Sequence, residues 1–339
     1  MTPSGWTDEL ARARLHVVTG KGGTGKTTLA AALAIALASQ QGRRVLLIEV
    51  EGRQGIAQLF DRAPLPYAEQ RIASAPGSGP GNGEVCALAV DAEAALLEYL
   101  AMFYNLGFAG RTLKRMGAIE FATTLAPGLR DVLFTGKIKE CVGRTDANGR
   151  HRYDAVVLDA PPTGRIVKFL DVTKAMVDLA KVGPIKGQSE GVAKLMHSGD
   201  TAVHLVTLLE EMPVRETLDA VAELDAADLR PGAVFMNRVL PDRLPTGVVD
   251  EAASGRIDQA EIGVALKAAG LTLTEDNLSD LVDETVEHAV RVQSEGRSRA
   301  HLREADLPTL ELPELTEGVD VAALYELAET LVAQGVRRA

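Results

Sequence analysis

Residues 15–28 read LHVVTGKGGTGKTT, and this stretch decides how the chain folds. The run Leu15–Thr19 has the apolar, β-branched composition of a buried strand, and Leu29–Ala38 is rich in the alanine and leucine typical of a helix. Between them lies the pattern G-x-x-x-x-G-K-[ST], a glycine loop whose backbone N–H groups can surround phosphate. The order of strand, glycine loop and helix predicts a nucleotide-binding α/β fold.

The loop supplies the candidate ligands for ATP and Mg²⁺. We expect a helix to begin near Lys26 and to add its positive end, with Lys26 reaching the β- and γ-phosphates. The Thr27 hydroxyl is the candidate Mg²⁺ ligand, while Thr28 either contacts the α-phosphate or packs locally. A chance glycine turn is disfavoured because motif, strand and helix agree. The predicted nucleotide-binding residues of the loop are Gly20, Gly22, Gly23, Thr24, Gly25, Lys26, Thr27 and Thr28.

A second lysine, Lys21, occupies the first variable position of the loop. A surface lysine there would be unremarkable by itself. Together with Gly22 and Gly23, however, it gives K-G-G-x-G-K-T, which resembles the deviant Walker A loop of the signal-recognition and MinD-type NTPases. In those families this lysine crosses a dimer interface to the partner's nucleotide. The resemblance therefore implies that Lys21 is catalytic and that the protein works as a dimer.

Composition limits the remaining function classes. The 339 residues are 46% hydrophobic, enough for one large α/β core or for one core with a helical annex. A net charge of −11 disfavours a broad nucleic-acid surface. No long uncharged apolar stretch and no apolar signal core occur, so we expect a cytoplasmic chain. Cys86 and Cys141 are far apart and lack a C-x-x-C pattern, so Mg²⁺ is the only inorganic partner expected.

Apolar and helical segments alternate along residues 12–339, which predicts a single ATPase domain with a doubly wound, mostly parallel sheet. Residues 73–84 (ASAPGSGPGNGE) have the composition of a flexible surface loop. The strands expected after the first are Arg44–Glu49, Val85–Val90, Tyr153–Asp159, Ala202–Thr207, Gly232–Asn237 and Pro308–Leu312.

Two parts of the chain do not belong to a minimal sheet with its covering helices. Residues 92–148 and 166–199 are expected to form an inserted helical subdomain, and the charged residues 250–305 a second helical insert. Methionine and aromatic side chains in the first two segments are interpreted as core, with a groove for a client protein as the alternative. These side chains include Phe108, Met116, Phe121, Phe134, Met176 and Met196.

The stretch Asp159–Arg165 (DAPPTGR) follows an apolar strand, where an aspartate can hold Mg²⁺ through water and the loop can sense the γ-phosphate. D-A-P-P-T-G-R-x-x-x-F-L resembles a stretch of the arsenite-pump ATPase (ArsA) family and its tail-anchored-protein-targeting relatives. The segments Ala87–Tyr99, Pro127–Asp131 and Val206–Thr217 resemble the same family. The similarity covers about residues 12–335 and extends to actinobacterial single-domain members, which are often encoded as paralogous pairs.

This resemblance implies further site residues. Asn237 matches the asparagine that reads adenine, although it could instead only cap its strand, and Pro313 would help complete the base pocket. Glu51 stands where the family has a water-orienting aspartate; the longer side chain means that the loop compensates or that hydrolysis is slow. Arg165 replaces the family's histidine. The metalloid-binding cysteines and the zinc C-x-x-C have no counterpart, so arsenite binding is not expected.

Three functions remain open at this point. The first is an ATP-hydrolysing dimeric switch that couples nucleotide state to a protein or membrane partner. The alternative is a slow or inactive nucleotide-dependent module that forms half of a heterodimer with a paralogue; the sequence leaves homodimer and heterodimer open. A chromosome- or division-positioning ATPase shares the loop, but it needs basic DNA-binding patches or a basic amphipathic C-terminal helix, and neither is apparent.

Overall fold

The structure is a computed structural model, and it describes residues 5–39, 42–75, 83–104, 127–171 and 184–339. Its centre is an eight-stranded sheet of order β3-β4-β2-β5-β1-β6-β7-β8. All neighbouring strands are parallel except the β3–β4 pair. The strands are β1 Leu15–Gly20, β2 Arg44–Glu49, β3 Gln70–Ser74, β4 Glu84–Ala89, β5 Ala155–Asp159, β6 Thr201–Leu208, β7 Pro231–Val239 and β8 Thr309–Pro313.

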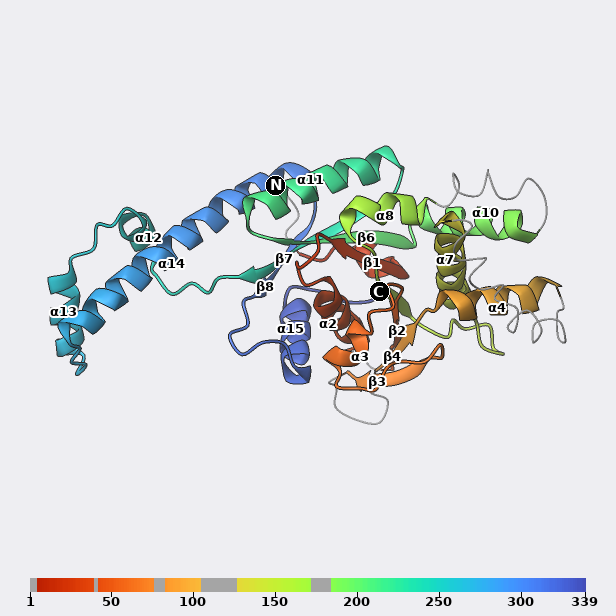
Figure 1. Cartoon of the computed structure of the whole chain (residues 1–339), viewed down its shortest axis with the longest axis horizontal. Helices are drawn as coiled ribbons and strands as arrows, with labels where there is room; N and C mark the ends of the chain where they lie inside the picture. The colour runs from red at the N-terminus through yellow and green to blue at the C-terminus, as the bar shows by residue number, and fades with distance from the viewer. Residues whose placement is uncertain (1–4, 40–41, 76–82, 105–126, 172–183) are drawn as a thin grey trace.

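Helices cover both faces of this sheet (Figure 1). Strand residues alternate between them: Leu47 packs into the cluster that includes helix α2, while Leu46 and Ile48 pack into the cluster on the opposite face. The predicted doubly wound α/β architecture is therefore confirmed. The helices are α1 Asp8–Arg12, α2 Lys26–Ala38, α3 Gly55–Leu59, α4 Ala92–Tyr104, α7 Pro127–Gly143, α8 Thr163–Leu170, α10 Pro184–Met196, α11 Glu211–Ala226, α12 Thr246–Ala253, α13 Gln259–Ala268, α14 Glu275–Leu302 and α15 Val321–Ala333.

Helix α2 is the most buried of these elements. Every residue from Leu29 to Ala38 is at most 1% exposed, so the helix is enclosed on all sides. Its many alanines let α15 and the sheet approach closely, and α15 contributes Leu324, Leu327 and Leu331 to the same cluster. This packing fixes the start of α2, where Lys26 and Thr27 lie.

The chain crosses from one side of β1 to the other, since β5 and β6 are its two neighbours. In a parallel sheet such a reversal leaves a crevice at the carboxyl ends of the strands. The segments that follow β1, β2, β5 and β7 all begin at that edge. The glycine loop follows β1 and Glu51 follows β2, while Asp159 is the last residue of β5 and Asn237 lies near the end of β7.

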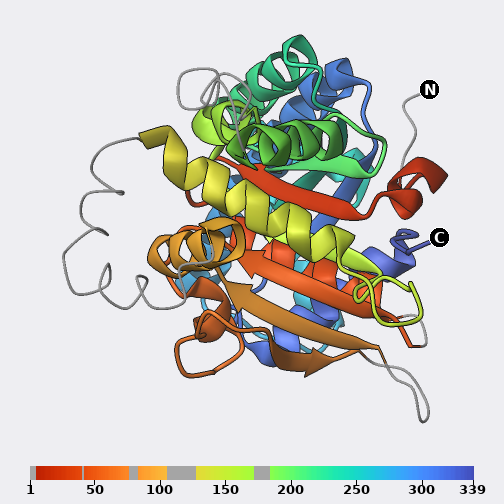
Figure 2. The same cartoon turned by 90° about the vertical axis from the view of Figure 1, so that its right-hand side faces the viewer.

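The first two helical segments gather on one face of the sheet. Helix α7 packs against α4, α8 and α10, and in Figure 2 it lies across that face. Phe134 and Met196 are buried in the core on that face, in agreement with the prediction that such side chains are core residues. Phe108, Met116, Phe121 and Met176 lie outside the described residues.

The insert predicted at 250–305 forms an arm of α12, α13 and α14 that extends away from the sheet (Figure 1). Most of the chain's net negative charge lies here, because residues 246–290 contain ten acidic and two basic side chains, against a net charge of −11 for the whole chain. Val264 and Leu271 on the arm are 69% and 56% exposed. Among the helices that the structure describes, none combines the length and apolar character needed for a bilayer span.

Strand β3 was not predicted from the sequence. It pairs antiparallel with β4 at the edge of the sheet, and its residues QRIAS are mixed in polarity because the strand is only half covered. The predicted loop 73–84 therefore begins inside β3 and ends inside β4, and residues 76–82 lie outside the described part.

A stack of buried rings ties β1 to β6. His16 and His204 are fully buried, with His16 Nδ1 3.0 Å from His204 Nε2, and Trp6 packs on both rings. The backbone N–H of Ala233 donates to His204 Nδ1, so the proton of neutral His204 lies on Nε2 and points at His16. Burial, reinforced by Arg338, lowers the pKa of His16 to about 3, and burial beside His16 lowers that of His204.

We predict that both imidazoles remain neutral at pH 5. Because their folded pKa values lie below the ordinary value of 6.5, the stability that the neutral pair contributes is fully present above that pH. It is lost as the pH falls toward the folded values. Imidazole NMR signals should keep their neutral-form shifts at pH 5, while the free energy of unfolding falls below pH 6.5. Ring titration near pH 6.5 would contradict this assignment.

Candidate active site

The glycine loop between β1 and α2 has no room for side chains at two positions. A Cβ at Gly20 would lie 2.3 Å from the carbonyl oxygen of Val206 in β6. Gly25 has a φ of 92°, in the left-handed region, and a Cβ there would lie 2.3 Å from Asn237 Nδ2. These glycines let the loop fold tightly against β6 and β7, so that it can present backbone N–H groups at the start of α2.

Lys26 lies at the first position of α2, facing the carboxylates of the neighbouring loops. Its Nζ donates to the carbonyl oxygen of Lys21 at 3.3 Å. Burial lowers the pKa of Lys26, while Asp159 and Glu51 raise it. The ammonium is therefore held within the loop, where it can act on an anion bound by the backbone N–H groups.

Thr27 and Asp159 contact each other directly. The Thr27 hydroxyl donates to Asp159 Oδ2 at 2.7 Å, joining the start of α2 to the end of β5. Asp159 is 9% exposed, and burial raises the pKa of its carboxyl to about 6, with Glu49 adding to the effect and the Thr27 hydrogen bond opposing it. A buried carboxylate beside a hydroxyl is an oxygen donor set that suits Mg²⁺.

Asn237 ends the straight part of β7 beside the glycine loop. Its Nδ2 donates to the carbonyl oxygen of Thr24 at 2.8 Å, so in this structure the amide also fixes the loop to the sheet. A cavity of about 220 Å³ opens next to it and includes Pro313. The structure thus brings together the two residues predicted for the base pocket. The cavity is lined by Gly25, Thr28, Asn237, Arg238, Pro313, Glu314, Leu315, Gly318, Val319 and Leu327.

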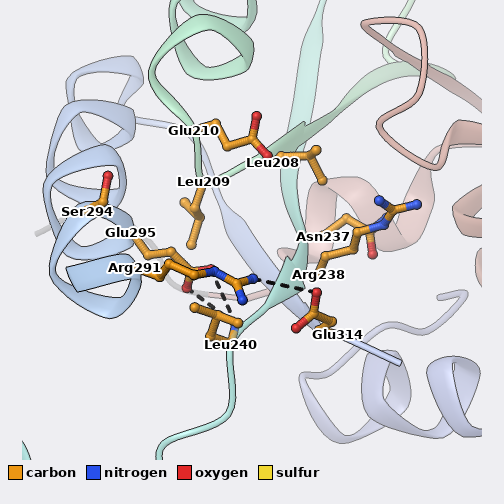
Figure 3. Close-up of a pocket in the computed structure, with 10 residues that line it drawn as sticks. All are labelled: Leu208, Leu209, Glu210, Asn237, Arg238, Leu240, Arg291, Ser294, Glu295 and Glu314. Atoms are coloured by element: carbon orange, nitrogen blue, oxygen red, sulfur yellow. Dashed lines mark hydrogen bonds and ion pairs between the residues drawn. The ribbon is translucent and has the colours of Figure 1, made fainter. Parts of the chain in front are cut away.

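A second cavity, of about 200 Å³, joins this region to the base of the arm (Figure 3). It shares Asn237, Arg238 and Glu314 with the first. From α14, Arg291 Nη2 lies 3.8 Å from Glu314 Oε1, and Glu295 accepts hydrogen bonds from the N–H of Leu240. Sequence reasoning missed these α14 residues, because no local motif marks a contact between segments so far apart in the chain.

Glu51 lies in the turn after β2, where its Oε2 is 3.6 Å from Arg53 Nε. Glu51 raises the pKa of both Lys26 and Asp159, which places its charge near the predicted phosphate and Mg²⁺ site. Glu49 instead accepts from the N–H groups of Gly55 and Ile56 at 3.2 Å, a structural role at the start of α3.

A cavity of about 130 Å³ connects the Glu51 turn with the segment after Asp159 and with α7. Three arginines and two carboxylates line it, so positive charge exceeds negative charge by one. Arg165, which replaces the family's histidine, is one of the arginines. The residues are Val50, Glu51, Arg53, Arg130, Asp131, Phe134, Pro161, Arg165 and Phe169.

Lys21 does not enter the cluster of Lys26, Thr27 and Asp159. Its Nζ lies 2.6 Å from Glu216 Oε1 on α11, and both side chains are more than one third exposed (38% and 36%). Glu216 was not assigned a role from sequence, although it lies in the Val206–Thr217 segment that resembles the family. The lysine is therefore at the surface, in an ion pair within its own chain.

Asp159→Asn is predicted to stabilise the metal-free protein at high pH. Since the folded pKa of about 6 exceeds the ordinary 3.8, the stability of the protonated form is present below pH 3.8 and lost as the pH rises through 6. Asparagine stays neutral and can still accept from Thr27. In EDTA, urea unfolding should show the variant about 1–3 kcal/mol more stable at pH 8 and little different at pH 4. An equal difference at both pH values would refute the assignment.

Comparison with known proteins agrees with this geometry. The model of the family described as anion-transporting ATPase (ArsA) matches residues 13–199. ATPase BagA of Mycobacterium tuberculosis (strain ATCC 25618 / H37Rv) is 56% identical over 333 residues, covering 98% of this chain and 96% of BagA. The arsenical pump-driving ATPase of Escherichia coli is 28% identical over 241 residues, covering 66% of this chain and 39% of that protein. ATPase GET3 of Kluyveromyces lactis is 23% identical over 256 residues, covering 66% and 71%. The chain belongs to the anion-transporting ATPase (ArsA) family.

Proposed function

We propose that this protein is an ATP-hydrolysing dimeric switch that couples its nucleotide state to a protein or membrane partner. The observation that carries the proposal is the hydrogen bond from Thr27 to Asp159, next to Lys26, at the carboxyl edge of the sheet. This is the arrangement that phosphoryl transfer requires: a cation for the phosphates and oxygen ligands for Mg²⁺. Membership of an ATPase family supports the same reaction.

In the proposed mechanism the protein mainly positions groups. Thr27 and Asp159 would hold Mg²⁺, and the ion would offset charge on the phosphates. Lys26 and the loop N–H groups hold the β- and γ-phosphates, and Glu51 orients the attacking water. Asn237 and Pro313 contact the adenine. Little covalent chemistry is needed, because positioning and charge stabilisation dominate phosphoryl transfer.

Lys21 acts on the nucleotide of the other subunit in this proposal. To do so it must leave Glu216, and that step costs little because exposed ion pairs contribute about 0–1 kcal/mol. The pair would hold Lys21 extended along α11 until a facing nucleotide attracts it. The dimer joins either two copies of this chain or this chain and a paralogue.

Two cavities connect the candidate nucleotide site with helices through which nucleotide binding could affect a partner. The Glu51 cavity joins the loops after β2 and β5 to α7, so ordering of those loops would shift the helical subdomain. The cavity of Figure 3 joins the base pocket to α14, so adenine binding would bear on the arm. The first route ends at α7, which covers one face of the sheet, and the second ends at α14, which belongs to the arm.

The second candidate function is a slow or inactive nucleotide-dependent module in a heterodimer. It is favoured by Glu51, which is longer than the family's aspartate and lies near Arg53. Turnover by the isolated chain separates the two candidates: sustained ATP hydrolysis supports the switch, and tight MgATP binding without turnover supports the module.

Lys21→Ala is predicted to separate binding from hydrolysis. MgATP affinity should stay within about threefold of wild type, while kcat falls at least about 100-fold, the usual cost of one transition-state donor. Glu216→Gln is the matched control, because it breaks the same ion pair but leaves the lysine free, and it should retain turnover. Equilibrium binding of a fluorescent ATP analogue and steady-state hydrolysis measure the two effects. Wild-type kcat in Lys21→Ala would reject a catalytic role for Lys21.

A further inference from the structure

A cavity lined by arginines lies at the amino-terminal ends of the strands, whereas the candidate nucleotide site lies at their carboxyl ends. The cavity has a volume of about 690 Å³. Arg14 directly precedes β1, Arg43 and Arg44 begin or precede β2, and Asp154 directly precedes β5. Since β1 has six residues, about 20 Å of strand separates this cavity from the glycine loop. We call it the arginine pocket; it is lined by Arg14, Gly42, Arg43, Arg44, Arg144, Thr145, Asp146, Arg150, His151, Arg152, Asp154 and Arg338.

The pocket concentrates positive charge in an acidic protein. Seven arginines and only two aspartates line it, whereas the chain as a whole has a net charge of −11. Like charges held together repel one another, so such a cluster persists only where anions compensate it.

Carboxylates of the same chain compensate four of the arginines. Arg43 pairs with Asp154 at 3.1 Å, and Arg152 pairs with Glu69 at 3.0 Å. Arg44 pairs with Glu84, and Arg144 pairs with Glu69 and Glu140. Within the described part of the chain, Arg14, Arg150 and Arg338 have no carboxylate in ion-pair distance. In the described part of the chain, three of the seven guanidinium groups therefore have no ion-pair partner of their own, although the charges of Asp154 and Asp200 also act on Arg14 and Arg338.

Arg14 and Arg338 are fixed in place without being neutralised. Arg14 Nη2 donates to the carbonyl oxygens of Val142 and Tyr153 at 3.1 and 3.0 Å. Its Nε is buried and has no acceptor among the described residues. Arg338 donates from Nε to the carbonyl oxygen of Asp154 at 2.9 Å and from Nη1 to that of Ala11 at 2.6 Å.

The two guanidinium groups also act on each other. Burial lowers the pKa of Arg14, and burial together with the charges of Arg14 and Arg43 lowers the pKa of Arg338. Backbone carbonyls thus hold two repelling cations at one cavity. Planar guanidinium groups fixed in this way suit the oxygens of phosphate, which they bind through paired hydrogen bonds.

We propose that the arginine pocket binds a small, multiply charged phosphate anion, either a soluble oligophosphate or a phosphorylated lipid headgroup. Its volume lies in the range of about 300–1,000 Å³ usual for small-ligand sites. Several phosphate charges would act at once on the three guanidinium groups that lack an ion-pair partner. This site is separate from the nucleotide site, so it does not depend on the proposed ATPase cycle.

The test is calorimetric titration of the full chain with inorganic tripolyphosphate, in the Lys26→Ala background so that the glycine loop is weakened as a competing site. One equivalent should bind. Arg150→Gln together with Arg338→Gln should weaken binding about 100-fold, at about tenfold for each lost charged hydrogen bond. Arg256→Gln, an exposed arginine on the arm, is the matched control and should bind like the parent.

A parallel arm measures pelleting with vesicles containing phosphatidic acid, compared with neutral phosphatidylcholine vesicles. Binding of tripolyphosphate alone assigns a soluble ligand, and pelleting that the double variant loses assigns a lipid headgroup. Arg150→Gln alone, at an exposed side chain, keeps the test valid if the double variant does not fold. The proposal is overturned if neither probe binds, or if Arg150→Gln binds both as tightly as Arg256→Gln.

Discussion

The carboxyl ends of the parallel strands lie at one edge of the sheet, and the site depends on this constraint. With β5 and β6 on either side of β1, the segments after β1 and β5 must meet, and the Thr27–Asp159 hydrogen bond is the contact that results. The enclosure of α2 holds its first turn against that edge. Burial in turn raises the pKa of Asp159, so the carboxyl that would hold Mg²⁺ is costly to ionise without a cation.

Helix α7 runs between two cavities of the molecule, one beside Glu51 and the other the arginine pocket. Near its start, Arg130, Asp131 and Phe134 line the cavity beside Glu51, and Arg144, just after its end, lines the arginine pocket. An anion in that pocket and a nucleotide at the opposite edge would therefore both bear on one helix. Because packed helices shift as rigid units, the helical face of Figure 2 is a natural place for the two sites to influence each other.

The sequence predicted the sheet, its parallel direction and the family, because glycine spacing, apolar strands and alternating helices are local signals. It placed Glu49 and Asp159 at the ends of two strands for the same reason. It missed β3, whose mixed residues lack the pattern of a buried strand. It also missed the Lys21–Glu216 pair, the α14 contacts of Arg291 and Glu295, and the arginine pocket, since each depends on contacts between distant segments.

The central claim is that ATP closes a dimer around the glycine loop. The most direct test is light scattering of the purified chain with MgADP and aluminium fluoride, an analogue of the transferring phosphate. A second sample contains the chain together with a paralogue purified with it from the native cell. The account predicts a doubled mass that requires the analogue and is lost in Thr27→Ala, where the proposed Mg²⁺ ligand is removed. A monomeric mass in both samples, with the analogue bound, would contradict it.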